Sequence, residues 1–229
     1  MLAQRVVTAL VLAALVIAAI FWFPSRITAG VITLVVLAGA WEWSAFPGFK
    51  HYLARLAYVA AIAACIAFVW SGGIDSQRAN QLLPAALVWW VLASIWVVSM
   101  PGYMNRASAA LAGVLVLVPA WLALVRLHQS APYWLLFLLL VVVAADVGAY
   151  FVGRAFGKHK LAPRVSPGKT WEGVGGGMAA AALMAVLGTV FFSVPIVAFI
   201  CMCVVVVVAS IVGDLTESLF KRHAGLKDS

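Results

Sequence analysis

Eight long apolar runs follow one another along this chain, and short polar segments separate them. The runs cover residues 6–23, 27–46, 52–70, 82–98, 107–125, 133–152, 173–192 and 196–220. Each is close to the roughly 20 residues that an α-helix needs to cross the hydrocarbon core of a bilayer. Their apolar residues do not alternate with polar ones, as the strands of a transmembrane barrel would. The pattern predicts an all-α fold, a polytopic helical integral membrane protein with about eight transmembrane helices.

The composition agrees with a membrane protein. Of 229 residues, 66% are hydrophobic and 10% are charged, and the mean hydropathy is +1.11. Soluble proteins carry about 25% charged residues, so a water-soluble domain is excluded. The first run is too long and too evenly apolar for a secretory signal peptide, whose apolar core has roughly 7–15 residues. It is therefore expected to be a membrane span.

The basic residues gather on one side of the predicted spans. Alternation places the N-terminus and the loops after the second, fourth, sixth and eighth runs together, and that side carries all of the 15 lysines and arginines except Arg26, Arg78 and Arg126. Because basic loops stay in the cytoplasm during insertion, this side is expected to face the cytoplasm, in the cell (inner) membrane. The net charge of +8 then reflects topology and anionic lipid, and no nucleic acid partner is expected.

Three acidic residues, Asp146, Asp214 and Glu217, interrupt the late apolar runs. Asp146 shares a helical face with Tyr150 and Gly153, and Asp214 shares one with Glu217, Ser218 and Lys221. A carboxylate inside a span costs roughly 2.5–3.5 kcal/mol on insertion scales and marks a functional site by default. The structural alternative is an internal ion pair that joins helices, such as Glu217 with Lys221.

A strongly basic loop lies between the sixth and seventh runs. It carries Arg154, Lys158, Lys160, Arg164 and Lys169, the last inside the segment Ser166-Pro167-Gly168-Lys169-Thr170. Such cations suit a polyphosphate, and carboxylates without thiol or imidazole partners suit Mg²⁺, which binds one or two carboxylates together with substrate phosphates. The loop is not a Walker loop. Metal-assisted phosphoryl or nucleotidyl transfer is the chemistry that these residues support.

The seventh run opens with Gly175, Gly176 and Gly177. These glycines have two possible roles. They could cradle a phosphate, or they could allow close helix packing, which is the commoner role of small residues in membranes.

At these positions the chain resembles the phosphatidate cytidylyltransferase family, also called CDP-diacylglycerol synthase. One block reads Asp146-x-x-x-Tyr150-x-x-Gly153-Arg154 and continues to Ser166-Pro167-x-Lys169-Thr170-x-Glu172-Gly173. A second block reads Ser218-x-x-Lys221-Arg222 and, four residues later, Lys227-Asp228, and Trp41-Glu42-Trp43 is also similar to the family. In the family the second block continues into further motifs and one more span, so this chain is expected to be truncated and the full-length member to have a ninth span.

The resemblance implies that CTP and phosphatidate, a membrane lipid, react to give CDP-diacylglycerol and pyrophosphate in phospholipid biosynthesis. It implies Mg²⁺ as cofactor with Asp214 and Asp146 as ligands, and Asp214, Lys169 and Asp146 as catalytic residues. The substrate-binding residues would be Arg154, Lys160, Arg164, Ser166, Thr170, Glu172, Ser218, Lys221, Arg222, Lys227 and Asp228. A second copy of the chain, giving a homodimer, is a further candidate partner.

The expected organisation has two parts. Residues 1–131 form the N-terminal transmembrane helices, spans one to five, and residues 132–229 form a catalytic membrane region, spans six to eight with the basic loop 153–172. Two other functions remain alternatives. A CTP-dependent polyprenol or lipid kinase would use the same nucleotide, and an ion-coupled membrane transporter would also carry acids in its spans, typically at broken helices in mid-membrane.

Overall fold

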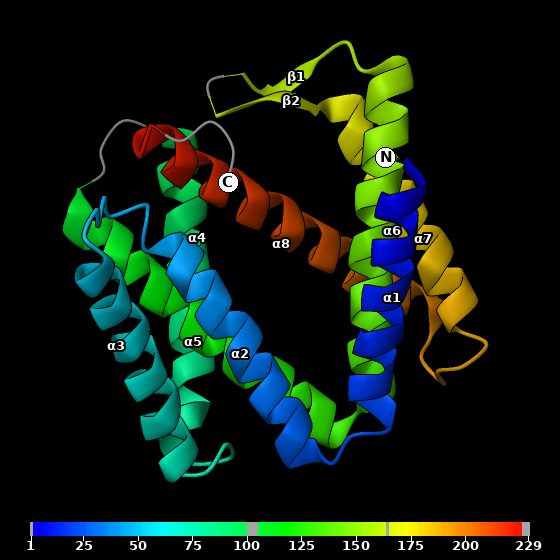
Figure 1. Ribbon diagram of the computed structural model, residues 1–229. Helices are drawn as coiled ribbons and strands as arrows, with labels where there is room; N and C mark the ends of the chain where they lie inside the picture. Colours follow the sequence, from blue (N-terminus) through cyan, green and yellow to red (C-terminus); the bar gives the residue numbers. More distant parts are fainter. Residues whose placement is uncertain (1, 100–104, 164, 226–229) are drawn as a thin grey trace. The chain divides into compact units, whose positions relative to one another are not determined.

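The computed structural model describes residues 2–99, 105–163 and 165–225. These residues form eight helices, drawn in Figure 1: α1 Leu2–Phe21, α2 Ser25–Trp43, α3 Tyr52–Ser71, α4 Gln77–Ser99, α5 Arg106–Ser130, α6 Pro132–Phe156, α7 Trp171–Gly188 and α8 Ile196–His223. Two short strands, β1 Lys160–Ala162 and β2 Ser166–Thr170, lie between α6 and α7. All eight predicted apolar runs therefore coincide with helices.

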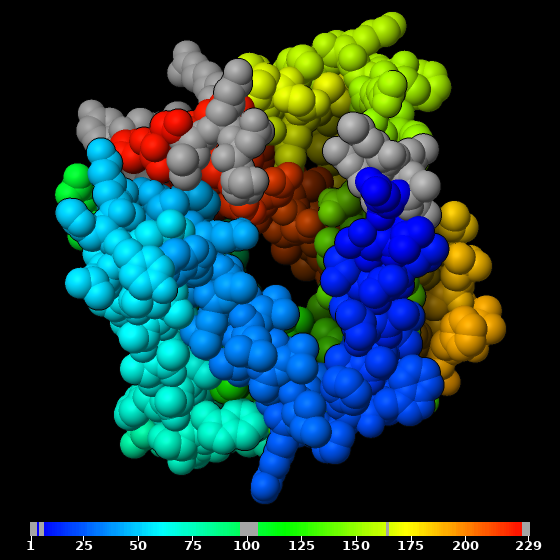
Figure 2. Space-filling model, in the orientation of Figure 1, coloured from blue at the N-terminus to red at the C-terminus, as the bar shows by residue number. Residues whose placement is uncertain are grey.

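Seven of these helices, α2 to α8, are long and apolar enough to cross a membrane, and the apolar part of α1, Val7–Phe21, is shorter. Large apolar side chains stay exposed along α1, including Leu10, Leu12 and Leu15, and α1 is the blue helix at the surface in Figure 2. In water such a surface would be unfavourable, whereas lipid tails are as apolar as these side chains. The prediction of a polytopic helical membrane protein is confirmed.

The chain divides into two compact units. The first contains Met1–Trp89 and Asn105–Leu136, and the second contains Trp90–Met104 and Phe137–Ser229. The helices α4 and α6 each contribute residues to both units.

Within the first unit, hydrogen bonds between helix ends establish an alternating arrangement. Thr28 Oγ1 at the start of α2 donates to the carbonyl of Ala19 at the end of α1, 2.7 Å away. Trp43 Nε1 at the end of α2 donates to the carbonyl of Ala109 at the start of α5, 2.9 Å away. The end of α2 and the start of α5 thus lie together, as expected if α3 and α4 cross to the other end and back.

Within the second unit, α6 and α7 pack closely through glycines. A Cβ atom added to Gly148 would lie 2.7 Å from the Gly176 carbonyl oxygen, and one added to Gly177 would lie 3.0 Å from the Ala145 carbonyl oxygen. Small residues allow such backbone approach between membrane helices. Gly176 and Gly177 therefore have the packing role that the sequence left open, while Gly175 is exposed and has nothing within 4 Å of an added Cβ.

The basic loop contains an antiparallel hairpin of β1 and β2, in which Lys160 pairs with Thr170 and Ala162 pairs with Ser166. The hairpin packs against α8 through the buried side chains of Val165 and Leu219, with Ala162 and Leu215 beside them. From the sequence this segment was expected to be a loop, because its Lys, Pro and Gly residues give it no alternating apolar pattern.

Candidate active site

A pocket of about 440 Å³ lies among α6, the hairpin, α7 and α8. Its polar lining side chains are Asp146, Tyr150, Arg154, Lys169, Thr170, Ser210 and Asp214, and its apolar ones include Ala145, Ala149, Val174, Val207 and Ile211. The pocket therefore joins charged groups from two helices, α6 and α8, and from strand β2 to an apolar wall.

Lys169 and Asp214 form a direct ion pair in this pocket, between Nζ and Oδ2. The lysine side chain is 25% exposed and the aspartate side chain is 58% exposed. Lys221, the basic residue on the helical face of Asp214, pairs with Glu217. The partner of Asp214 instead comes from β2, and its position depends on the fold of the hairpin.

Asp146 lies on α6 and lines the same pocket. It makes no ion pair with any described residue. Among the residues that the structure describes, no group of three or more His, Cys, Asp or Glu side chains could hold a metal ion. Because Mg²⁺ binds proteins through as few as one or two carboxylates and completes its shell with water and substrate phosphate, Asp146 and Asp214 are a donor set that fits it.

Arg154 lies two turns beyond Asp146 on the pocket side of α6. Its Nη1 atom donates a hydrogen bond of 2.8 Å to the hydroxyl oxygen of Tyr150. The guanidinium also lies 6.0 Å from the centre of the tyrosine ring. Tyr150 therefore positions an exposed cation along the wall that carries Asp146.

Thr170 connects the hairpin to α7. Its side chain is buried, and its Oγ1 atom accepts a hydrogen bond of 3.1 Å from the backbone N–H of Gly173. This is an N-cap, which satisfies one of the free donors at the start of a helix. Gly173 and Val174 of the same helical turn also line the pocket, so the positive end of the α7 dipole faces the space that an anion would enter.

Glu172 closes the base of the hairpin. Its Oε1 atom lies 2.6 Å from Nδ1 of His159, and both carboxylate oxygens accept from the backbone N–H of His159 at 3.2 Å. Trp171 adds a backbone hydrogen bond of 2.9 Å to the His159 carbonyl. His159 was absent from the residues predicted from sequence, since a single histidine in a basic loop has no diagnostic spacing.

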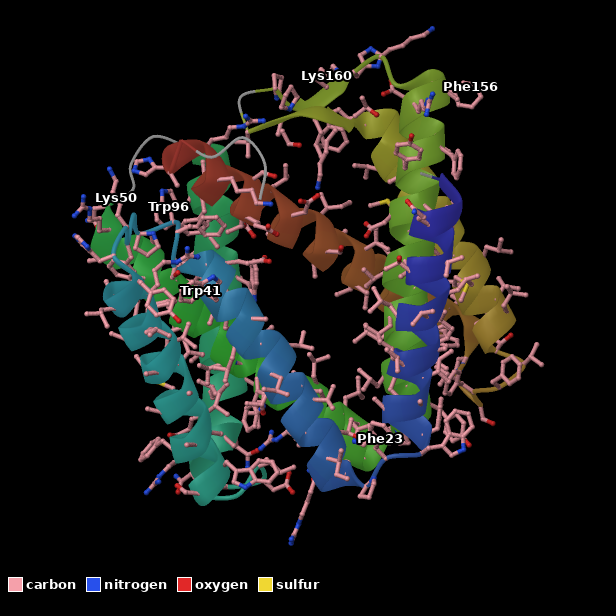
Figure 3. The ribbon with its side chains drawn as sticks, in the orientation of Figure 1. Phe23, Trp41, Lys50, Trp96, Phe156 and Lys160 are labelled. Carbon is pink, nitrogen blue, oxygen red and sulfur yellow. The ribbon has the colours of Figure 1, made fainter. Side chains whose placement is uncertain are left out.

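Other predicted residues lie around the pocket without lining it. Glu217 and Lys221 form the ion pair of 2.7 Å that the structural alternative above named, but both residues lie on α8, so the pair does not join two helices. Arg222 Nε donates to the Val165 carbonyl at 3.4 Å. Lys160 is exposed on the hairpin (Figure 3), beyond the end of α6 that Phe156 marks.

The structure thus brings together five predicted site residues, Asp146, Arg154, Lys169, Thr170 and Asp214. The residues that do not line the pocket are Lys160, Ser166, Glu172, Ser218, Lys221 and Arg222. Arg164, Lys227 and Asp228 lie outside the described residues.

The fold and the pocket define a polytopic membrane protein whose site combines carboxylates, cations and a helix N-terminus. The chain matches the cytidylyltransferase family over residues 3–229, and it belongs to that family. This confirms the resemblance recognised from the two sequence blocks.

Relatives named phosphatidate cytidylyltransferase are similar over the full length of the chain. The Pseudomonas aeruginosa protein is 42% identical over 252 residues, which cover 100% of this chain and 87% of the relative. The Haemophilus influenzae protein is 40% identical over 257 residues, which cover 100% of this chain and 89% of the relative. A shorter match, 44% identical over 103 residues, covers 42% of this chain and 36% of the Brucella suis relative.

Proposed function

We propose that this protein is a phosphatidate cytidylyltransferase, which converts CTP and phosphatidate to CDP-diacylglycerol and pyrophosphate. The observation that carries the proposal is the shared pocket of Lys169, Asp214 and Asp146 in a chain whose full-length relatives bear that name. Membership of the cytidylyltransferase family favours nucleotidyl transfer over the kinase and transporter alternatives.

The reaction needs no side-chain nucleophile. An oxygen of the phosphatidate phosphate forms a bond to the α-phosphorus of CTP, and the bond from that phosphorus to the α–β bridging oxygen breaks, so pyrophosphate leaves with the electron pair. Because the attacking phosphate is already an anion, the enzyme's contribution is in-line positioning and neutralisation of charge.

The cations of the pocket suit the nucleotide. Lys169 and Arg154 line the pocket and would bind triphosphate oxygens. The start of α7 would add backbone N–H groups to the same anion. Lys221 and Arg222, near the end of α8, would hold the lipid phosphate or the departing pyrophosphate.

Asp214 and Asp146 would hold Mg²⁺, which would neutralise negative charge on the triphosphate and polarise the α-phosphate. The apolar part of the pocket, which includes Val174, Val207 and Ile211, suits the diacylglycerol part of the second substrate. A pocket lined by both charged and apolar side chains fits the combination of a nucleotide and a lipid.

The site is proposed to lie on the cytoplasmic side of the inner membrane. The support is the charge distribution, since only Arg26, Arg78 and Arg126 of the 15 basic residues fall in loops of the opposite side. CTP is a cytosolic nucleotide, and the head group of phosphatidate lies at the membrane interface, so both substrates reach that side.

The test is incubation of the detergent-solubilised chain with phosphatidate, Mg²⁺ and CTP that carries ³²P on either the α- or the γ-phosphate. Cytidylyl transfer sends the α-label into lipid and leaves the γ-label in pyrophosphate. A kinase acting on an added polyprenol would send only the γ-label into lipid. Absence of α-label from the lipid product under saturating substrates would refute the proposal.

A further inference from the structure

The ion pair between Lys169 and Asp214 joins two side chains to which the proposed function gives different ligands. The ammonium group is to bind a triphosphate oxygen, and the carboxylate is to bind Mg²⁺. In the structure Nζ of the lysine contacts Oδ2 of the aspartate. The ammonium group therefore occupies the position on Asp214 that Mg²⁺ would take. The carboxylate likewise occupies the position on Lys169 that a triphosphate oxygen would take.

We propose that this pair makes the binding of the divalent cation and of CTP mutually dependent, an inference that rests on the proposed function. A cation that binds Asp214 releases Lys169 for the triphosphate, and a triphosphate that binds Lys169 releases Asp214 for the cation. Such coupling is reciprocal, because a ligand that tightens the binding of another by some factor is itself tightened by that factor.

Both side chains are accessible enough for exchange to occur. Lys169 is 25% exposed and Asp214 is 58% exposed, and ion pairs between partly exposed side chains contribute little net stability. Mg²⁺ needs direct contact with carboxylate oxygen, and an ammonium group on that oxygen opposes the contact by occupancy and by like charge. The pair therefore competes with Mg²⁺ for Asp214 and with triphosphate for Lys169, and either ligand can displace it.

Opening the pair leaves the hairpin in place, because other contacts hold it. Val165 packs against Leu219 on α8, Thr170 caps α7, and Glu172 binds His159 at the base of the hairpin. The exchange therefore involves the two side chains alone, and variants of either are expected to fold.

The pocket supplies a matched control for each partner. Arg154 is a second cation on the pocket wall, but its guanidinium bonds to Tyr150 and not to Asp214. Asp146 is a second carboxylate of the same pocket, outside the pair. Neutralising a control residue changes the charge of the pocket without freeing either partner.

The first experiment measures binding of Mn²⁺, used as the probe cation, to the purified full chain without nucleotide, by electron paramagnetic resonance of the free ion. Lys169→Met should bind Mn²⁺ about five-fold more tightly than wild type, the factor that corresponds to an exposed ion pair at the upper end of the usual range. Arg154→Met should change the affinity by less than about two-fold, because the Arg154 guanidinium bonds to Tyr150 and does not compete for the Asp214 carboxylate.

The second experiment measures binding of radiolabelled CTP in excess EDTA, so that no divalent cation is present. Asp214→Asn should bind CTP about five-fold more tightly than wild type, because Lys169 is freed. Asp146→Asn should improve binding less, since it removes a carboxylate without releasing the lysine.

The proposal is overturned if Lys169→Met and Asp214→Asn gain no more affinity than their controls. Its failure is separable from failure of the proposed function. Wild-type protein that makes CDP-diacylglycerol but shows equal affinities in variants and controls refutes only the coupling. Wild-type protein that incorporates no α-label into lipid refutes the function.

Discussion

The carboxylate of Glu172, at the start of α7, binds the imidazole and the backbone N–H of His159, just ahead of β1. The two residues close the open end of the hairpin whose second strand carries Lys169. A glutamate expected from sequence to touch substrate thus lies next to the site and holds the strand that supplies a cation to it.

Removing that carboxylate's charge is expected to loosen the hairpin. Glu172→Gln should lower kcat/KM for CTP by about ten-fold, because a misplacement of about 1 Å at a charged contact costs up to roughly 100-fold in rate. Steady-state kinetics on variants with unchanged gel-filtration profiles checks this. Asp75→Asn is the control, because Asp75 is 91% exposed beside Arg126 in the other unit and should leave kcat/KM unaltered.

Asp214 should be required for catalysis if it holds the metal. Asp214→Asn keeps the shape of the side chain but loses the charge that a hard cation needs, so activity at saturating Mg²⁺ should fall by about 100-fold or more. Circular dichroism should show native helix content. Asp146→Asn is expected to lose less, and full activity in the Asp214 variant would assign Asp214 a structural role.

The identity of the cation at position 169 should matter beyond its charge. Lys169→Arg replaces a compact ammonium by a wider planar fork and should lower kcat/KM for CTP by at least about ten-fold, or about 1.4 kcal/mol of transition-state stabilisation. Lys158→Arg, on the exposed part of the same loop, should change little. Equal kinetics in both variants and wild type would mean that the loop serves only membrane insertion.

The α6–α7 glycines should respond unequally to a methyl group. A Cβ at Gly176 would lie 2.5 Å from Cβ of Val152 and 2.7 Å from the Gly148 carbonyl oxygen, so Gly176→Ala should destabilise the protein by about 1–3 kcal/mol. Gly175→Ala has open space and should be neutral or stabilising by up to about 1 kcal/mol through helix propensity. Thermal unfolding in detergent compares them. A loss of stability in both variants would argue against the close packing as its cause.

The charge distribution predicts the orientation in the membrane. In a variant with Cys65, Cys201 and Cys203 replaced, a cysteine introduced at Lys158 should react with an impermeant maleimide only from the cytoplasmic side. A cysteine at Arg78 should react only from the opposite side. Reaction of both positions from one side would overturn the assignment of spans.

The helices were predictable because the length and polarity of an apolar run are local properties of the sequence, and each of the eight runs coincides with a helix. Asp146 and Asp214 could be selected because an acid inside a span is costly wherever the chain folds. Tertiary pairings could not be predicted. The contact of Lys169 with Asp214 depends on a hairpin whose strands lack the alternation that signals a strand, and the bond of His159 to Glu172 depends on the same hairpin.

Lys160 was predicted from the sequence to bind substrate, but it does not line the pocket. Its charge and its place in the basic loop selected it as a substrate residue, and both properties are real. A strand directs successive side chains to opposite faces, however, and Lys160 is exposed on the hairpin rather than part of the pocket wall. Charge clustering indicated the correct segment, but it could not separate the residues that face the pocket from those that face solvent.

Strand β2 ends at Thr170 and α7 begins at Trp171, so no linker separates the residue after Lys169 from a membrane helix. A single inserted residue at this junction would rotate α7 by about 100° relative to the strand and would remove both the cap and the glycine contacts with α6. The position of Lys169 on β2 therefore depends on the depth and rotation of α7 in the bilayer. The junction is therefore expected to be sensitive to a change of chain length as well as to a change of residue type.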